Sequence, residues 1–403
     1  MTSRKILYIS GSRADYGPAR GLLLAIQNDP SLNLGILVTG MHLDPLHGET
    51  WREIEADGFE IVDKIFGRVT GDSLSVMAAS MGLYLYGMSQ AIDRNHPDIV
   101  LVLGDRGEQL AGAMAAAFQN VVVVHLCGGS VSGSIDDSIR HAITKFAHYH
   151  LPAFEEHARR IIQMGEDPST VHVVGLPGGD IRADVKYSRD EICTDYTLPK
   201  EQPYLLVVQH SVTHSQENTA IQITETLEAL RILPFPVLMA NPNDDAGGRV
   251  IIAKMSEYAS RYPHLRILPP LRSRERFASI MTHAGALVGN SSSGIVEAMS
   301  VGLPVVNIGD RQRGREHLAC LLNVEYSREE IRDAVLKALS DGAYREQLKG
   351  FTKRNVRQNG PVKVLDVLRC LDLHSAKRPK TFQNITPRKR DDYQRKKGHT
   401  SSD

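Results

Sequence analysis

Residues suited to acid–base chemistry gather in the stretch 121-VVVVHLCGGSVSGSIDDSIRHAITK-145. A run of valines leads into a Gly-Gly turn, and the next segment carries the neighbouring acids Asp136 and Asp137. Arg140, His141 and Lys145 follow shortly after them. Carboxylates are frequent general acids and bases, and nearby basic groups can hold their position and charge. The stretch is therefore a candidate acid–base site.

Two further runs combine a glycine with an arginine and an acid. The run 11-GSRADYG-17 contains Arg13, whose planar guanidinium suits the forked recognition of a phosphate. A surface pair of Arg13 and Asp15 is the simpler interpretation of the same run. The second run, 104-GDRGEQ-109, contributes Asp105, Arg106 and Glu108.

The richest run in the second half is 289-GNSSSGIVEAMSVGLPVVNIGDRQRGR-315. Three serines, Ser291 and Ser292 among them, precede a predicted helix whose first turn has free N–H groups and the positive end of the helix dipole, which together suit a phosphate. An ordinary serine-capped helix would have the same sequence. Glu297 could accept hydrogen bonds from a ribose diol, and Arg311 could bind a diphosphate. His210, in 209-QHSVTH-214, is a further candidate at a strand end, where a structural histidine is the simpler interpretation.

Short apolar segments must position these residues. Unalternating runs rich in Val, Ile and Leu predict strands buried on both faces of a parallel sheet. In the first half they are 5–10, 34–40, 98–105, 120–126 and 171–177, and in the second half 204–210, 236–241, 265–270, 286–290 and 304–309. Helix-like stretches such as 73–95 and 108–120 lie between them.

Alternating strands and helices predict an α/β fold with two Rossmann-like domains, joined through the polar stretch 178–200. We assign residues 1–180 to the first domain, with the acid–base residues, and 200–373 to the second, with the phosphate-binding residues. Ligands of such sheets bind at the carboxyl ends of the strands, so we expect a cleft between the domains. Residues 374–403 are basic and poor in apolar groups, which predicts a disordered, solvated tail rather than a binding patch for RNA or membrane.

Composition narrows the class of protein. The chain has 403 residues, 42% of them hydrophobic and 23% charged, with a formal net charge of zero. This balance argues against nucleic acid or an anionic membrane as a partner. The four scattered cysteines form no C-x-x-C pair, and no apolar stretch is long enough to span a bilayer, so we expect a cytoplasmic protein. His141, His148 and His150 lack partners at ligand spacing, and no metal site is predicted.

Several long motifs resemble one family of enzymes. They are GSRADYG, GDR, GGSVSGSIDDSIRHAITKFAHYH, QHSVT, PNDDAG, HAGALVGNSSSGIVEA and NIGDRQRGR, and they span about residue 5 to about residue 370. The chain resembles the hydrolysing UDP-N-acetylglucosamine 2-epimerases, in particular the sialic-acid branch that includes bacterial enzymes and the epimerase half of the animal bifunctional epimerase/kinase.

The resemblance implies the two-domain GT-B fold and a reaction in two steps. UDP is eliminated across C1–C2 of the sugar, and water then adds to release a free 2-epimerised sugar. Such chemistry conserves oxidation state, so no cofactor is expected, and family members are commonly homodimers or homotetramers.

The resemblance also implies roles for residues of the motifs. At the sugar end they are Asp105, Arg106, Asp136 and Asp137, of which Asp137 is the better candidate acid–base residue of its pair, and His42 lies near the cleft. The implied UDP contacts are Arg13, His210, Asn243, Ser291, Ser292, Glu297 and Arg311, with Asp15 added as a binding residue.

One position departs from the family pattern. Relatives read Gly-Gly-Glu where this chain reads Gly128-Gly129-Ser130, and the resemblance implies that this glutamate is an essential acid. A serine cannot transfer a proton near neutral pH without a partner base. A hydrolysing 2-epimerase would then need Asp105, Asp137 or Glu108 in that role. Two alternatives are an enzyme of the same fold that cleaves or transfers without changing C2, and a non-catalytic nucleotide-sugar binding protein.

Overall fold

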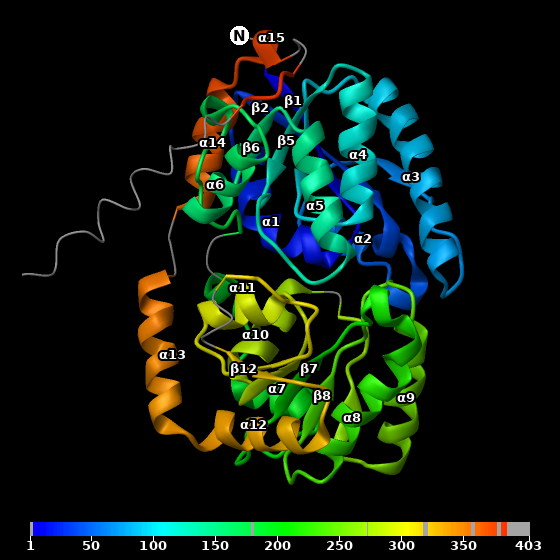
Figure 1. Ribbon diagram of the computed structural model, residues 1–403, viewed down its shortest axis with the longest axis vertical. Coiled ribbons are helices and arrows are strands. Elements are labelled where there is room, and N and C mark those ends of the chain that lie inside the picture. The colour runs from blue at the N-terminus through cyan, green and yellow to red at the C-terminus, as the bar shows by residue number, and fades with distance from the viewer. Residues whose placement is uncertain are drawn as a thin grey trace, which may run out of the picture.

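The computed structural model describes residues 3–178, 181–271, 273–316, 321–355, 359–376 and 380–384. Within them the chain forms two stacked domains, each built on a six-stranded parallel sheet with helices on both faces (Figure 1). No helix of the described part of the chain is long and apolar enough to cross a membrane.

The N-terminal sheet has the strand order β3-β2-β1-β4-β5-β6. Its strands are β1 (Arg4–Ser10), β2 (Leu32–Thr39), β3 (Ile61–Ile65), β4 (Ile99–Leu103), β5 (Val122–Leu126) and β6 (Tyr149–Leu151). Its helices are α1 (Arg13–Gln27), α2 (Trp51–Ala56), α3 (Leu74–Asn95), α4 (Gly107–Phe118), α5 (Ile135–Phe146) and α6 (Glu155–Gln163).

The apolar composition of the central strands explains their position. All residues of β4 and β5 are buried, as expected for strands covered on both faces. Side chains alternate between the faces, so that Ile6 and Tyr8 pack towards α1 while Leu7 and Ile9 pack towards α3 and α4.

The C-terminal sheet repeats this plan with the order β12-β11-β10-β7-β8-β9. Its strands are β7 (Leu205–Val208), β8 (Val237–Met239), β9 (Leu265–Ile267), β10 (Ala286–Gly289), β11 (Val305–Ile308) and β12 (Leu322–Val324). Its helices are α7 (Arg189–Asp195), α8 (Thr219–Arg231), α9 (Gly248–Arg261), α10 (Arg274–His283), α11 (Ser293–Ser300), α12 (Arg328–Ser340) and α13 (Gly342–Asn355). In both sheets the order reverses beside the first strand, where ligands of such folds bind.

The end of the chain returns to the N-terminal domain. Helix α14 (Gly360–Cys370) lies beside the upper lobe in Figure 1, whereas α13 lies along the lower lobe. Val364 and Leu368 of α14 are fully buried in the same core cluster as α1. The predicted domain of residues 200–373 is therefore wrong at its end, because α14 supplies an apolar face to the other domain. Its start also differs, since Ile181 and α7 belong to the C-terminal core.

The predicted strands differ from the observed ones in four places. Strands β3, β6 and β12 were not predicted, because each is short and lies towards a sheet edge, where the apolar pattern is weak. The predicted strand 171–177 is wrong, since only Val171 makes an isolated bridge, to His150. The other predicted strands are confirmed, most of them with shorter bounds, although β1 and β2 begin earlier than predicted.

The predicted tail, residues 374–403, is described only in part. Helix α15 (Leu373–Ala376) is the last helix of the described residues. Lys380 donates to the carbonyl groups of Thr144 and Ala147 at the end of α5, at 2.9 and 2.6 Å, and forms an ion pair of 2.5 Å with the buried Glu166. Residues 380–384 are solvent-exposed as predicted, but the contacts of Lys380 contradict the prediction that they are disordered, and residues 385–403 lie outside the described part.

Candidate active site

A cavity of about 430 Å³ lies between the domains, at the carboxyl ends of both sheets. Its N-terminal wall comes from the segments after β1, β2, β4, β5 and β6, and its C-terminal wall from the segments after β7 to β11. The predicted cleft is therefore confirmed. The predicted residues that line it are Arg13, Asp15, Asp105, Arg106, Ser130, Asp136, His210, Asn243, Ser291, Ser292, Glu297 and Arg311.

The serines lie at the start of α11. Ser291 Oγ accepts hydrogen bonds from Ser293 Oγ at 2.9 Å and from the Ser293 N–H at 3.3 Å, while the Ser292 side chain caps no N–H group. One of the N–H groups that were predicted to be free, that of Ser293, is therefore already hydrogen-bonded within the turn. Hydroxyl groups and the positive end of the α11 dipole remain to face a ligand.

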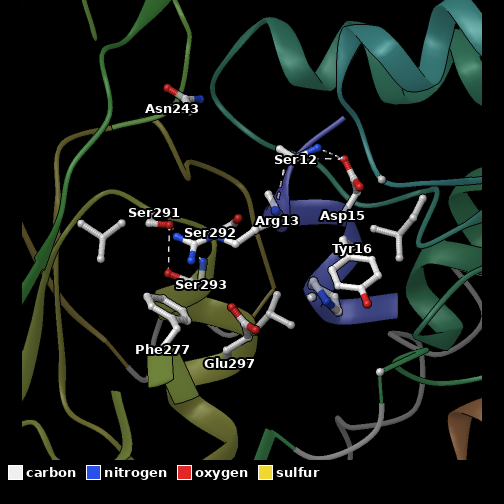
Figure 2. Close-up of a pocket in the computed structure, with 18 of the residues that line it drawn as sticks. Ser12, Arg13, Asp15, Tyr16, Asn243, Phe277, Ser291, Ser292, Ser293 and Glu297 are labelled. Atoms are coloured by element: carbon white, nitrogen blue, oxygen red, sulfur yellow. Dashed lines mark hydrogen bonds between the residues drawn. The ribbon is translucent and has the colours of Figure 1, made fainter. Parts of the chain in front are cut away.

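Arg13 comes from the other domain and faces this turn. Figure 2 shows its side chain extending from the start of α1 towards the serines of α11. Its guanidinium also donates to the Leu271 carbonyl group, in the loop after β9. Arg13 therefore places a cation at the helix end that favours an anion.

Asp15 has a structural task in the same loop. Its carboxylate accepts hydrogen bonds from Ser10 Oγ at 2.5 Å and from the N–H groups of Gly11 and Ser12 at 3.0 Å. Ser12 caps α1 in a capping box with Asp15. Burial raises the pKa of Asp15 to about 7, although these hydrogen bonds lower it. Asp15 therefore holds the loop that carries Arg13, and because it also lines the cavity its role as a binding residue stays a prediction.

Glu297 lies in the second turn of α11 and lines the cavity (Figure 2). Arg274 Nη1 lies 2.8 Å from one of its carboxylate oxygens, and Arg274 Nε lies 2.9 Å from Asp184. The Arg274 N–H donates to the buried Glu53 of the first domain at 2.5 Å. Arg274 was not predicted, because its sequence context resembles an ordinary charged helix start.

Ion pairs across the cleft join the two domains. Arg311 Nη2 lies 3.2 Å from Asp136 and 3.7 Å from Asp245, and Arg106 Nη1 lies 2.9 Å from Asp245. All four side chains are largely buried. The pairs Arg311–Asp136 and Arg106–Asp245 join different domains, whereas Arg311–Asp245 lies within the C-terminal domain, so both arginines are held at the space between the domains.

His210 is held as a neutral imidazole. The Asn243 N–H donates to His210 Nδ1 at 2.9 Å, so Nε2 carries the ring proton. Burial, with the charges of Arg311 and Arg106, lowers the pKa of His210 to about 3. His210 lines the cavity as a neutral hydrogen-bond donor.

The sugar end predicted from the sequence is organised by two arginines. Arg140 is 1% exposed and pairs with Asp105, and its Nη1 lies 3.1 Å from Asp137. Arg315, from the loop after β11, lies 3.4 Å from Asp105. Asp105 is therefore held between cations from both domains.

Asp105 and Asp136 have pKa values that are driven apart. Burial would raise the pKa of Asp105, but Arg140 and Arg315 outweigh it, so the carboxyl remains ionised. Burial raises the pKa of Asp136, and the negative charge of Asp105 raises it further. One carboxyl is thus suited to accept a proton and its neighbour to hold one.

A carboxylate from the second domain lies beside Ser130. Ser130 Oγ donates to Glu316 Oε2 at 3.2 Å, and His157 Nε2 lies 2.9 Å from the same oxygen. Arg160 Nη1 donates to the other oxygen at 3.3 Å. Glu316 immediately follows the run that ends at Arg315, so its place after β11 was the signal that could have indicated it.

Cys127 occupies the turn after β5, with a positive φ of 60°. Its side chain lines the cavity, and burial, with the neighbouring charge of Asp105, raises the pKa of the thiol to about 12. Cys127 is therefore a neutral, weakly polar group beside the acids.

Three predicted residues do not line the cavity. His42 is fully buried between Ser10 Oγ, at 2.9 Å from Nε2, and Thr50 Oγ1, at 2.7 Å from Nδ1. Glu108 is buried under the glycines of neighbouring loops and lies 3.9 Å from Arg106. Asp137 accepts from the Ser132 N–H at 2.8 Å and so holds the loop. The structure thus places Asp136, rather than Asp137, on the cavity wall, and the catalytic or binding roles of these residues stay predictions.

The two Rossmann-like domains and the charged cleft between them define an enzyme of the GT-B-like class. The family model described as UDP-N-acetylglucosamine 2-epimerase matches residues 24–368. The chain belongs to the hydrolysing UDP-N-acetylglucosamine 2-epimerase family.

Similar curated proteins act on different sugars, according to their names. The chain is 38% identical to the UDP-N,N'-diacetylbacillosamine 2-epimerase (hydrolyzing) of Legionella pneumophila over 86% of this chain and 90% of that protein. It is 34% identical to the UDP-N-acetylglucosamine 2-epimerase of Neisseria meningitidis over 85% of this chain and 89% of that protein.

Solved structures share the fold. The structure of the Neisseria meningitidis UDP-GlcNAc 2-epimerase bound to UDP-GlcNAc matches with a TM-score of 0.74 and 15% identity, covering 90% of this chain and 99% of that one. A putative UDP-N-acetylglucosamine 2-epimerase from Listeria monocytogenes matches with a TM-score of 0.74 and 17% identity, covering 96% and 100%.

Proposed function

We propose that this protein is a hydrolysing nucleotide-sugar 2-epimerase that acts on UDP-GlcNAc or a modified UDP-N-acetylhexosamine. The observation that carries the proposal is the pairing of Asp105 and Asp136 in one cleft with Arg311 and the α11 serines. An acid–base pair beside an anion-binding helix end suits a substrate with a reacting sugar and a diphosphate. The relatives named for diacetylbacillosamine and for N-acetylglucosamine support this class of sugar.

In the first half-reaction, UDP leaves from C1 as the C2 proton is removed and a C1=C2 double bond forms. Arg311 and Arg13 stabilise the charge that develops on the diphosphate, and the neutral His210 donates Nε2–H to it. Cations and donors already placed in a buried cleft are effective because they need not reorganise during the reaction.

In the second half-reaction, a water oxygen bonds to C1 and a proton returns to C2 on the opposite face. The products are UDP and a free 2-epimerised sugar. Asp105, ionised, suits the activation of this water, and Asp136, with its raised pKa, suits the delivery of a proton.

The test is incubation of the purified protein with UDP-GlcNAc, and separately with UDP-N,N'-diacetylbacillosamine, in heavy water. We expect a free 2-epimer with deuterium at C2, identified by NMR, from one or both. UDP release without deuterium at C2 would favour cleavage or transfer without epimerisation, which Ser130 suggests. UDP binding without release would indicate a binding protein.

A further inference from the structure

We propose that Glu316 is a catalytic carboxylate of this enzyme, which takes the C2 proton of the sugar while UDP is eliminated. The inference rests on the proposed function. It assigns removal of the C2 proton to a residue of the C-terminal domain, whereas the sequence predicts this role for Asp105, Asp137 or Glu108 of the N-terminal domain.

The position of Glu316 is the first argument. Its carboxylate lines the cavity beside Ser130, and its side chain is only 12% exposed. The Ser130 carbonyl group accepts a hydrogen bond from Arg140 Nη1 at 3.2 Å. Ser130 therefore connects Glu316 to Arg140, the arginine that pairs with Asp105 and Asp137. Glu316 thus adds a carboxylate to the sugar end at the residue where this chain carries a serine.

The partners of Glu316 keep its carboxylate ionised and hold it in place. His157 Nε2 and Arg160 Nη1 lie on different carboxylate oxygens, at 2.9 and 3.3 Å. Burial alone would raise the pKa of Glu316, but His157 and then Arg160 outweigh it and lower the pKa to about 2. The group is therefore ionised at neutral pH, and its orientation is set from two sides.

The chemistry needs such an additional group. Inversion at C2 requires that a proton leave one face of the ring and another reach the opposite face. Asp105 and Asp136 come from one wall of the cleft, whereas Glu316 comes from the loop after β11. In the proposed step the C2–H bond breaks, its electrons form C1=C2, and the C1–O bond electrons leave with UDP. The proton on Glu316 passes to solvent. In the second half-reaction the water gives OH to C1 and its proton to Asp105, while Asp136 gives its proton to C2, and Asp136 is reprotonated as Asp105 loses its proton.

The origin of Glu316 also links catalysis to domain closure. The loop that carries it contacts the opposite wall, where the Gly133 N–H donates to the Arg311 carbonyl group at 3.0 Å. Separation of the domains would withdraw Glu316 from Ser130 and His157. The base is thus complete only when the cleft is closed around the nucleotide sugar, which also retains the glycal until the water of the second half-reaction adds to it.

The test compares Glu316→Gln with native protein on the sugar that gives the free epimer. We expect kcat to fall by about 10²–10⁴-fold, the usual contribution of a general base, together with C2 deuterium incorporation, while the Kd for UDP stays within about twofold. The double variant Ser130→Glu/Glu316→Gln should have a kcat at least about tenfold higher than that of Glu316→Gln, because it restores a carboxylate beside the position of the Glu316 side chain. The matched control is Glu156→Gln, since Glu156 also pairs with Arg160, at 3.5 Å, but is 57% exposed.

The outcomes separate this inference from the function beneath it. An active native enzyme with a Glu316→Gln kcat within about threefold of native overturns only the inference, because a general base contributes far more. If Glu316→Gln loses as much UDP affinity as kcat, the inference is also overturned, because Glu316 would then act only in closing the two domains. A native protein that releases no 2-epimer overturns the proposed function itself. Thermal denaturation of each variant establishes that it is folded.

Discussion

At the scale of single residues, the site works by opposing burial with neighbouring charge. Asp105 and Asp136 have the same side chain and lie in one cavity, yet cations lower the pKa of the first while burial and its neighbour raise that of the second. Differences of this kind assign acid and base roles among identical groups. Asp137, one residue further along α5, turns to the loop instead.

The first prediction separates the two adjacent acids. Asp136→Asn should lower kcat for epimer formation by about 10²–10⁴-fold, because it removes a proton-transfer group. Asp137→Asn should keep kcat within about tenfold and mainly lower the melting temperature, because it weakens hydrogen bonds worth roughly 0.5–1.5 kcal/mol each. Steady-state kinetics and thermal denaturation of both variants check this. The reverse order of kcat would reassign the cavity acid to Asp137.

The second prediction concerns Arg311. Arg311→Ala should weaken UDP binding by about tenfold or more, since a charge-assisted contact is worth roughly 1.5–3 kcal/mol. Arg311→Lys keeps the charge but loses the fork, so an intermediate affinity is expected. Isothermal calorimetry with UDP gives both values. Equal affinity of the alanine variant and native protein would exclude a diphosphate contact.

At the scale of elements, loops at the carboxyl ends of the two sheets contact each other across the cleft. Gly133, before α5, lies against the backbone of Asp310, after β11. A Cβ atom there would overlap the Asp310 carbonyl oxygen, and backbone atoms cannot move aside as a flexible side chain can. The glycine therefore permits the close approach that brings Arg311 and Glu316 to the other domain.

The third prediction follows from this contact. Gly133→Ala should lower kcat/KM by about tenfold or more, because a displacement of about 1 Å can cost two orders of magnitude in rate. The matched control is Gly350→Ala, where nothing lies within 4 Å of the added Cβ and α13 should gain up to about 1 kcal/mol in helix propensity. Kinetics and melting temperatures of both variants provide the measurement. A Gly133→Ala variant with native kcat/KM would show that the loops part without consequence.

At the scale of the whole molecule, the end of the chain fastens onto the N-terminal domain. Helix α14 buries Val364 and Leu368 against α1, and Lys380 follows with an ion pair to Glu166. Glu166 is fully buried, and Lys145 and His150 contact it at 2.5 and 3.1 Å. The C-terminal segment is thus a structural part of the domain in which the chain begins.

The fourth prediction compares two truncations. Removal of residues 377–403 should lower the melting temperature by several degrees, because lost hydrogen bonds and charge pairing cost about 1–3 kcal/mol and each kcal/mol moves Tm by roughly 2–4 °C. Removal of residues 385–403 keeps Lys380 and should leave Tm unchanged, as the composition of that segment predicts. Scanning calorimetry distinguishes them. Equal Tm values for both truncations and the full chain would show that the Lys380 contacts contribute nothing.

The layered α/β architecture and most of the cavity wall follow from the amino-acid sequence alone. Unalternating apolar runs can be buried only by helices on both faces, and parallel strands bring the residues after them to one edge. Arg13, Asp105, His210 and Arg311 each follow such a run, so their convergence required no knowledge of long-range contacts.

Two features of the cavity follow only from the tertiary structure. One is which of two neighbouring acids lines the cavity, and the other is which domain contributes the carboxylate beside Ser130. Asp136 and Asp137 are identical in type, and their separation depends on how α5 is rotated against Ser132 and Arg140. The approach of Glu316 to Ser130 depends on the docking of two domains whose contact leaves no periodic signal in the chain. Local apolar patterns indicate which face of a helix or strand is buried. Contacts between domains join residues that are far apart in the sequence, and the geometry of these contacts depends on the packing of the whole molecule.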